Sequence, residues 1–267
     1  MWYNNRIMKF IALSSGSSGN CVYLEEEGNA VLIDCGISIR ALETGLRSIG
    51  SDLSAIKAVL VTHEHNDHIK GLDNLTRLMD VPVYCHKSTA DCLGGSLLKN
   101  DLIIPFEKGF EFPFMKVDFS ECSHDASFCV GYRVTGERDR FVSLTDTGEL
   151  PVDFVDFVKG ADTVLLESNY DPIMLKTGPY PAFLKKRISG SHGHLSNEQA
   201  AEALKKLPDL NVKRVFLGHL SQNNNTAELA FNVAVSNLSH CGITEGRDLR
   251  VFVIPHGKRS MFTDVGV

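Results

Sequence analysis

The sequence predicts an α/β fold, and three observations support this prediction. Short apolar runs rich in β-branched residues alternate along the chain with longer segments of helical periodicity. One of these runs, residues 58–62 (AVLVT), is apolar and β-branched, which is typical of a central strand covered on both faces. Residues 38–49 have a helical pattern and are followed by Gly50, the residue type favoured directly after a helix.

The expected elements follow in order along the chain. Apolar, β-branched or aromatic runs bounded by polar or glycine-containing segments predict strands at residues 10–13, 21–24, 30–34, 58–62, 81–85, 112–120, 127–134, 140–144, 163–166, 214–217 and 249–254. Helical patterns predict helices at residues 38–49, 151–158, 196–207 and 226–239. Ser196 is a suitable N-cap for the third helix, and the polar turn 223–225 (NNN) can cap the fourth.

Length and composition predict a single globular domain over residues 1–267. The chain is 43% hydrophobic and 22% charged, which permits a sizeable core, and it has no repeat or low-complexity linker. Residues 1–7 are polar and irregular, and we expect them to form a disordered extension. Since the sequence has neither a run of about 20 apolar residues nor a signal peptide, we expect a cytoplasmic protein without membrane association.

Charge and cysteine content exclude several classes of protein. The net charge of −6 argues against a nucleic-acid binder that relies on a broad basic face, although it permits a local basic patch. The seven cysteines are scattered and include no C-x-x-C pair. The sequence therefore indicates neither a disulfide framework nor a zinc ribbon.

The strongest functional signal is the segment 62–68 (THEHNDH), directly after the apolar strand. Side chains two positions apart in an extended segment point the same way, so His63 and His65 can bind one cation. Asp67 and His68, where the chain turns toward a helix, can face a second cation. The alternatives are a solvated polar loop and a single-metal structural site. Four potential ligands at the carboxyl end of a buried strand favour the two-metal interpretation.

Further candidate ligands each follow a predicted strand, namely His124, Asp146 and His219. With the H-x-H-x-D-H motif of residues 63–68, they occur in an order that resembles the metallo-β-lactamase-fold hydrolases. The resemblance implies an αββα sandwich of two mixed β-sheets flanked by helices, with a two-metal centre at the edges of the sheets. It also implies which residues bind each metal: His63, His65 and His124 the first, Asp67, His68 and His219 the second, with Asp146 bridging.

Asp34, in the segment 32–36 (LIDCG), resembles an early aspartate of that family. The resemblance implies that Asp34 does not bind the metal itself but holds a metal ligand in place. The alternative is that Asp34 only closes the turn before Gly36. The candidate metal ligands include no thiolate, so zinc, manganese and iron are all chemically acceptable, and we expect two divalent zinc or manganese ions.

Residues 189–201 (SGSHGHLSNEQAA) place His192 and His194 just before a helix capped by Ser196. A histidine at a helix N-terminus is well placed beside an anionic phosphate. The segment resembles one in ribonuclease Z and in phosphodiesterases of this fold, which implies that His194 contacts the scissile phosphate and assists the leaving group. The alternatives are a ligand or capping role for His194 and an ordinary loop position for His192.

Two other segments are candidates for binding a phosphodiester backbone. A basic run directly before the histidine loop consists of Lys185, Lys186 and Arg187. Residues 13–21 (LSSGSSGNC) are dense in glycine and hydroxyl groups and can wrap a phosphate with backbone amides and polar side chains, including those of Ser15, Ser17 and Asn20. Taken separately, the first segment can be a solvated surface and the second a flexible hairpin loop.

Together, these segments resemble the bacterial YycJ/WalJ (VicX) family over nearly the whole chain. Besides the segments above, the similarity includes residues 166–171 (LESNYD), 178–181 (GPYP) and 193–197 (GHLSN). It implies a cytoplasmic, metal-dependent 5′-to-3′ exonuclease acting on DNA, linked to mismatch repair or cell-wall signalling. Tyr170 departs from the family pattern, which has a histidine there, and 267 residues leave no room for the β-CASP domain of the RNA-processing relatives.

The sequence thus predicts a metal-dependent phosphodiesterase or nuclease in which Asp67 and His194 are catalytic and DNA is the substrate. Two alternatives remain at this point. One is a hydrolase of a small cyclic phosphodiester or thioester, which the acidic net charge favours. The other is a regulatory protein that keeps the metal centre without catalysis.

Overall fold

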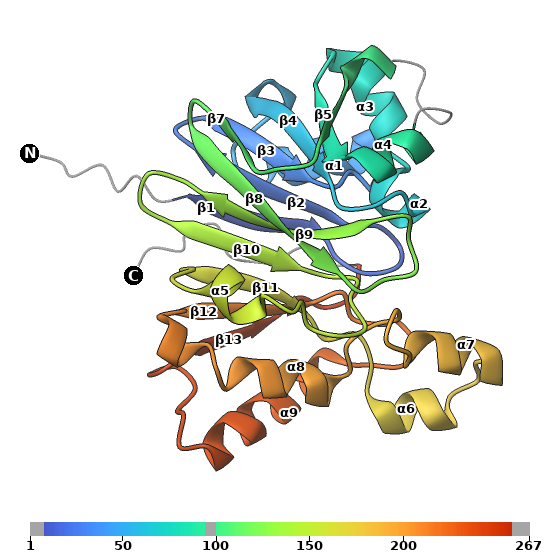
Figure 1. Ribbon diagram of the computed structural model, residues 1–267, viewed down its shortest axis with the longest axis vertical. Coiled ribbons are helices and arrows are strands. Elements are labelled where there is room, and N and C mark those ends of the chain that lie inside the picture. The colour runs from blue at the N-terminus through green and yellow to red at the C-terminus, as the bar shows by residue number, and fades with distance from the viewer. Residues whose placement is uncertain (1–7, 94–99, 258–267) are drawn as a thin grey trace, which may run out of the picture.

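The computed structural model describes residues 8–93 and 100–257, which form two β-sheets packed face to face between two layers of helices (Figure 1). The predicted αββα sandwich of two mixed sheets is confirmed. The prediction for residues 1–7 lies outside the described residues. In the described part of the chain, no helix combines the length and apolar character that a membrane span requires.

The first sheet has six strands in chain order; the first two neighbouring pairs are antiparallel, and the remaining three pairs, from the third strand to the sixth, are parallel. Its strands are β1 (Lys9–Ser14), β2 (Cys21–Glu26), β3 (Asn29–Ile33), β4 (Ile56–Val61), β5 (Val83–His86) and β6 (Ile103–Phe106). The second sheet has seven strands in the order β13-β12-β11-β10-β9-β8-β7. These are β7 (Phe110–Phe112), β8 (Met115–Cys122), β9 (Cys129–Thr135), β10 (Arg140–Leu144), β11 (Thr163–Glu167), β12 (Arg214–Gly218) and β13 (Arg250–Val253).

Helices cover the outer face of each sheet (Figure 1). On the first sheet these are α1 (Ile39–Arg47), α3 (Leu72–Met79) and α4 (Lys87–Leu93), with the single turn α2 (Asn66–Ile69) beside them. On the second sheet they are α5 (Phe154–Val158), α8 (Asn197–Leu204) and α9 (Ala227–His240). Two further helices, α6 (Pro172–Thr177) and α7 (Ala182–Ile188), lie at one side, and three 3₁₀ turns occupy Leu53–Ala55, Asn100–Leu102 and Pro208–Leu210.

The apolar core has three layers, one between the two sheets and one between each sheet and its helices. The alternation of side chains along the strands explains this arrangement. Side chains that point to opposite faces of a strand enter different layers, so Leu60 packs between the two sheets while Val59 and Val61 pack under the helices. The aromatic rings of Phe10, Phe141 and Phe216 join both sheets in the central layer, with ring centroids 4.7 and 4.8 Å apart. These ring contacts help to hold the two sheets together.

The observed elements correct the sequence prediction at several points. Residues 112–120 are not one strand, because Pro113 and Phe114 form a two-residue turn that pairs Phe112 of β7 with Met115 of β8. The helix expected at residues 196–207 ends at Leu204. The sequence prediction did not include α3, α4, α6, α7 or β6, each of which is at most eight residues long.

Candidate metal centre

The candidate site lies where strands of both sheets end. His63 follows β4 of the first sheet, whereas His124, Asp146 and His219 follow β8, β10 and β12 of the second. Because the two sheets pack face to face, these turns meet at one end of the sandwich. Four overlapping groups of side chains there have possible ligand atoms within 4.8 Å of one another.

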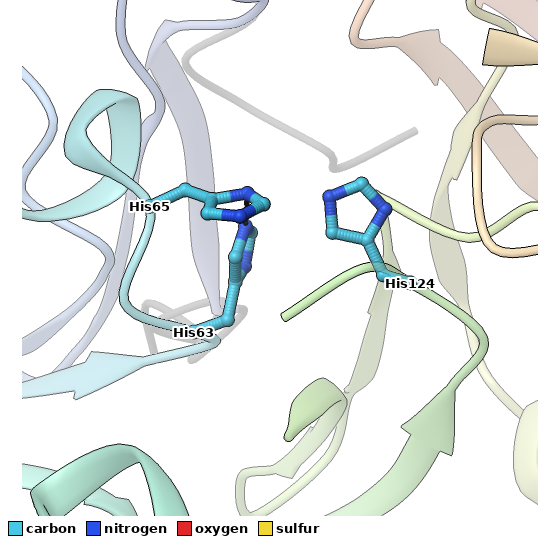
Figure 2. A group of neighbouring side chains, drawn as sticks. All are labelled: His63, His65 and His124. Carbon is cyan, nitrogen blue, oxygen red and sulfur yellow. Dashed lines mark hydrogen bonds between the residues drawn. The ribbon is translucent and has the colours of Figure 1, made fainter. Parts of the chain in front are cut away.

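The first group consists of His63, His65 and His124. Nε2 of His63 lies 3.0 Å from Nδ1 of His65, so the two imidazoles that the spacing predicts on one side of the segment do meet. His124 comes from the second sheet, and its ring centroid lies 5.1 Å from those of both other histidines. Figure 2 shows His63 and His65 on one segment with His124 opposite them.

The second group consists of Asp67, His68 and His219, and Asp146 lies between the two groups. Oδ2 of Asp146 is 3.3 Å from Nε2 of His68, and Oδ1 is 3.5 Å from Nε2 of His219. The same Oδ1 is 3.9 Å from Nε2 of His124, a member of the first group. Asp146 is therefore the only one of the seven predicted ligands with a carboxylate that faces both groups.

Four histidines of the cluster share one orientation, in which Nδ1 contacts a group outside the cluster and Nε2 faces inward. Such outer contacts fix the ring orientation of metal-binding histidines and select the nitrogen that binds. The four Nδ1 contacts join His63 to the Thr62 hydroxyl (3.0 Å), His68 to Asp34 (2.7 Å), His124 to the Gly193 carbonyl (3.0 Å) and His219 to Glu167 (2.7 Å).

Asp34 is buried behind His68. Its Oδ1 accepts a hydrogen bond from the backbone N–H of Thr62 at 2.8 Å, and its Oδ2 contacts both the Thr62 hydroxyl and His68. The carboxylate thus joins the end of β3 to the start of the histidine motif. The alternative was that Asp34 only closes the local turn. Its hydrogen bonds instead go to Thr62 and His68, which lie outside that turn.

Three residues of the site have left-handed backbone conformations that are uncommon for residues other than glycine. The φ values are +63° for Asp34, +58° for Asp146 and +55° for His219. Each such conformation costs about 1 kcal/mol or more and persists where the surrounding structure enforces it. All three residues lie just beyond strand ends, where the turn directs the side chain into the site.

The charges of the cluster balance one another. Burial and the charge of His68 hold the pKa of His63 well below its usual value. Burial alone would lower the pKa of His68, but Asp34 and Asp146 raise it well above the usual value. Burial would likewise raise the pKa of Asp146, but His219 and His68 hold it well below the usual value.

The cluster still has unmet bonding capacity. Nε2 of His219 and Oδ2 of Asp146 are buried and make no hydrogen bond, although Oδ2 lies 3.3 Å from Nε2 of His68. An unsatisfied buried polar atom is costly and usually indicates an ion, a water or a catalytic role. The imidazole and carboxylate donors around these atoms are those that divalent zinc, manganese and iron accept, so the residues fit a metal centre.

Comparison with known proteins agrees with this geometry. The β-lactamase superfamily domain matches residues 29–220. Over 250 residues the chain is 37% identical to exodeoxyribonuclease WalJ of Streptococcus pneumoniae serotype 2 (strain D39 / NCTC 7466), covering 91% of this chain and 93% of that protein. Over 231 residues it is 35% identical to exodeoxyribonuclease YycJ of Bacillus anthracis, covering 84% and 86% of the two chains. The chain belongs to the WalJ/YycJ family of the β-lactamase superfamily.

Solved structures show the same fold. YhfI of Bacillus subtilis, a metallo-β-lactamase fold protein, superposes with a TM-score of 0.72 at 17% identity and covers 95% of this chain and 98% of its own. The short form of human tRNase Z superposes with a TM-score of 0.63 at 18% identity, covering 97% and 100%. The family and the fold that the sequence predicts are both confirmed.

Glu167 is a site residue of this WalJ/YycJ family member that the sequence analysis quoted in a motif but assigned no role. Its Oε1 lies 2.8 Å from Nδ1 of His194 and 2.7 Å from Nδ1 of His219. Its Oε2 accepts hydrogen bonds from the backbone N–H groups of Thr147 and Leu195. A carboxylate that ends the otherwise apolar strand β11 was the available signal, because a fully buried glutamate needs partners.

The pKa of Glu167 reflects this setting. Burial would raise the pKa, but the charge of His194 and the hydrogen bonds from His194 and His219 lower it to about 2. Glu167 is therefore ionised at neutral pH. A buried carboxylate that contacts two imidazoles fixes the orientation of both rings.

The glycine-rich segment of this family member lies against the centre. Nδ2 of Asn20 is 2.9 Å from Nε2 of His68 and 3.3 Å from Oδ2 of Asp67. The hydroxyl of Ser15 is buried and accepts a hydrogen bond from the backbone N–H of His219 at 2.7 Å. Ser17 is exposed. Two of these three predicted substrate contacts thus position site residues.

The basic run has three different environments. Nζ of Lys185 donates to the Lys176 carbonyl at 2.7 Å, and Nη2 of Arg187 lies 3.0 Å from Oδ1 of Asp125. Lys186 is exposed. Since Oδ1 of Asp125 is 3.4 Å from Nε2 of His124, Arg187 reaches the rim of the metal centre.

His192 is also exposed, and it lines a groove of about 590 Å³ that begins at His124. Tyr170, which replaces the expected histidine, is buried in a small apolar cluster with Leu175 and Ile188. Tyr170 thus contributes an aromatic ring to the apolar cluster next to the His194 loop.

Proposed function

We propose that this protein is a metal-dependent exonuclease that degrades DNA from the 5′ end toward the 3′ end. The observation that carries the proposal is the buried Asp146 carboxylate, whose oxygens lie 3.3 to 3.9 Å from the Nε2 atoms of His68, His124 and His219 and whose Oδ2 makes no hydrogen bond. The names of the WalJ and YycJ relatives support the substrate class. Action on DNA is compatible with the cytoplasmic location that the sequence predicts.

We assign two cations to the centre. His63, His65 and His124 would hold the first, Asp67, His68 and His219 the second, and Asp146 would bridge them. Zinc or manganese suits these donors best, and iron is chemically acceptable. Divalent cations bound there supply Lewis acidity and activate water near neutral pH.

The protein's own residues supply orientation and proton transfer. Asp67 is partly exposed at the edge of the cluster, next to Asn20, and we assign it to orient the attacking water toward the phosphorus. Since Glu167 contacts Nδ1 of His194, Nε2 of that ring is the atom left to act on the substrate. We assign His194 to donate a hydrogen bond or a proton from Nε2 to the phosphoryl group or its leaving oxygen.

The surroundings of the centre suit an extended substrate. The groove beside His124 is lined by Ser123, Phe128 and His192 among others, and its 590 Å³ exceeds what a single phosphate needs. Lys186 and Ser17 are exposed and can contact the phosphate backbone. Ser15, Asn20, Lys185 and Arg187 would support binding mainly by holding neighbouring groups in place.

The test is incubation with end-labelled duplex DNA that carries a 5′-phosphate or a 5′-hydroxyl, with and without manganese. We expect manganese-dependent release of nucleotides from the 5′ end by the wild-type protein and none by Asp146→Asn. Turnover of bis(4-nitrophenyl) phosphate or a thioester without any action on DNA would favour a small-molecule hydrolase instead. A metal-loaded protein inactive on every phosphodiester would favour the regulatory alternative.

A further inference from the structure

Two short helices form an arm beside the candidate centre. The arm comprises residues 172–188, with α6 and α7, and it connects Glu167 at the end of β11 with the His194 loop. In Figure 1 it stands to one side of α8 and α9, away from the stacked sheets. Its apolar contacts form a separate small cluster rather than part of the main core: Tyr170, Leu175 and Ile188, with Tyr180 and Leu184 partly buried.

The surface of the arm is unusual for this protein in charge and in polarity. Residues 172–188 include four basic residues and no acidic residue, although the whole chain has a net charge of −6. Phe183 is 76% exposed and Ile173 is 73% exposed. Large apolar side chains at this exposure, on a basic element next to a site, indicate a binding surface.

Three exposed residues share one face of α7. Phe183, Lys186 and Arg187 are spaced by three and four positions, and residues with this spacing are neighbours on a helix surface. Arg187 pairs with Asp125, which lies beside His124, so this face adjoins the rim of the metal centre. With a rise of 1.5 Å per residue, Phe183 lies about 6 Å from Arg187 along the helix axis, toward the start of α7.

Resting on the proposed nuclease function, we propose that this face of α7 is a single-stranded DNA contact in which Phe183 stacks on an unpaired base. Lys186 contacts the adjacent phosphate, and the Arg187–Asp125 pair fixes the helix at the rim. An aromatic ring stacks on any base, which suits an enzyme that must act on every sequence. The positive charge of the arm suits a polyanion such as nucleic acid rather than a basic or neutral partner.

The test compares Phe183→Ala, Phe183→Trp and Leu78→Ala, the last a control at an apolar position on α3 that is 58% exposed. On single-stranded DNA we expect kcat/KM to fall about tenfold for Phe183→Ala and to be retained in Phe183→Trp and in Leu78→Ala. Turnover of bis(4-nitrophenyl) phosphate should be the same in all of them. Equal DNA cleavage by Phe183→Ala and wild type would overturn the inference while leaving the nuclease function intact.

A binding measurement separates the two proposals. The chain has a single tryptophan, Trp2, so a Trp2→Phe/Phe183→Trp variant reports fluorescence from position 183 alone. We expect quenching by a phosphorothioate oligothymidylate, and a weaker dependence of binding on salt in Lys186→Ala. Absence of quenching would overturn the inference even for a protein that does not cleave DNA, whereas quenching without DNA cleavage would overturn only the proposed function.

Discussion

Nδ1 of His68 lies 2.7 Å from Oδ2 of Asp34, and both side chains are buried at the point where β3 and β4 end. The carboxylate fixes the ring so that Nε2 faces Asp146. An outer carboxylate of this kind raises the basicity of a histidine ligand. The position of Asp34 at the end of β3 therefore influences how tightly the centre binds its metal.

Asp34→Asn should weaken divalent metal binding by roughly 10- to 100-fold, because the amide keeps the size of the side chain but loses its charge. Asparagine tolerates the left-handed backbone at this position, so the fold should persist. Calorimetric titration with Mn²⁺ or Zn²⁺ measures the change. Asp80→Asn is the matched control, since Asp80 also has a positive φ of +47° but ends α3. Equal affinities of both variants and wild type would contradict the role of Asp34.

Metal addition should stabilise the stripped protein. The buried atoms without partners, on Asp146 and His219, would gain bonds in the folded state only. At 100 times Kd, a ligand of the native state adds about 2.7 kcal/mol to the free energy of unfolding, which corresponds to roughly 5 to 10 °C in Tm for a chain of this size. Thermal denaturation with EDTA and with Mn²⁺ measures the shift. Asp146→Asn should lose most of it, and an undiminished shift would exclude Asp146 as a bridge.

His194→Ala should lower kcat on DNA by about 10²- to 10⁴-fold with little effect on the Tm shift caused by metal. Glu167→Gln should also lower kcat, because the amide holds the His194 ring less firmly than the carboxylate does. Since the pKa of Glu167 is about 2, its own titration should add no step to the wild-type pH–rate profile above about pH 4. His240→Ala, at the exposed end of α9, is the control and should retain wild-type rates.

Glu26 makes a pH-dependent contribution to stability far from the centre. Burial raises its pKa above the usual value of 4.5 and the charge of Asp139 adds to this effect, although a hydrogen bond from the backbone N–H of Glu137 opposes it. The folded protein therefore binds the proton more tightly than the unfolded chain, so the free energy of unfolding falls as pH rises through this range. Glu26→Gln should unfold at a higher Tm than wild type at pH 7, with the gain absent below about pH 4. The exposed Glu111→Gln should show no such pH dependence, and equal behaviour of the two variants would contradict the prediction.

Local patterns account for what the sequence predicted well. Alternation in an extended segment places His63 and His65 on one side, and this geometry needs no knowledge of the rest of the chain. The same holds for the apolar run that forms β4 and for the N-cap at Ser196. Periodicity failed where a strand-like run contained its own turn, as at Pro113, because the turn residues are flanked by apolar residues on both sides.

The sequence by itself determined the H-x-H-x-D-H motif, which depends on residue types at short, fixed spacings, and its resemblance to known proteins implied the family and the sandwich fold. Only the tertiary structure decided which distant groups meet. Glu167 contacts His194 and His219, which are 27 and 52 positions further along the chain, and Arg187 reaches back to Asp125. These contacts depend on the order of strands in the second sheet and on how its turns converge with those of the first. Short-range spacing contains no information about either, because they are fixed by the packing of whole layers.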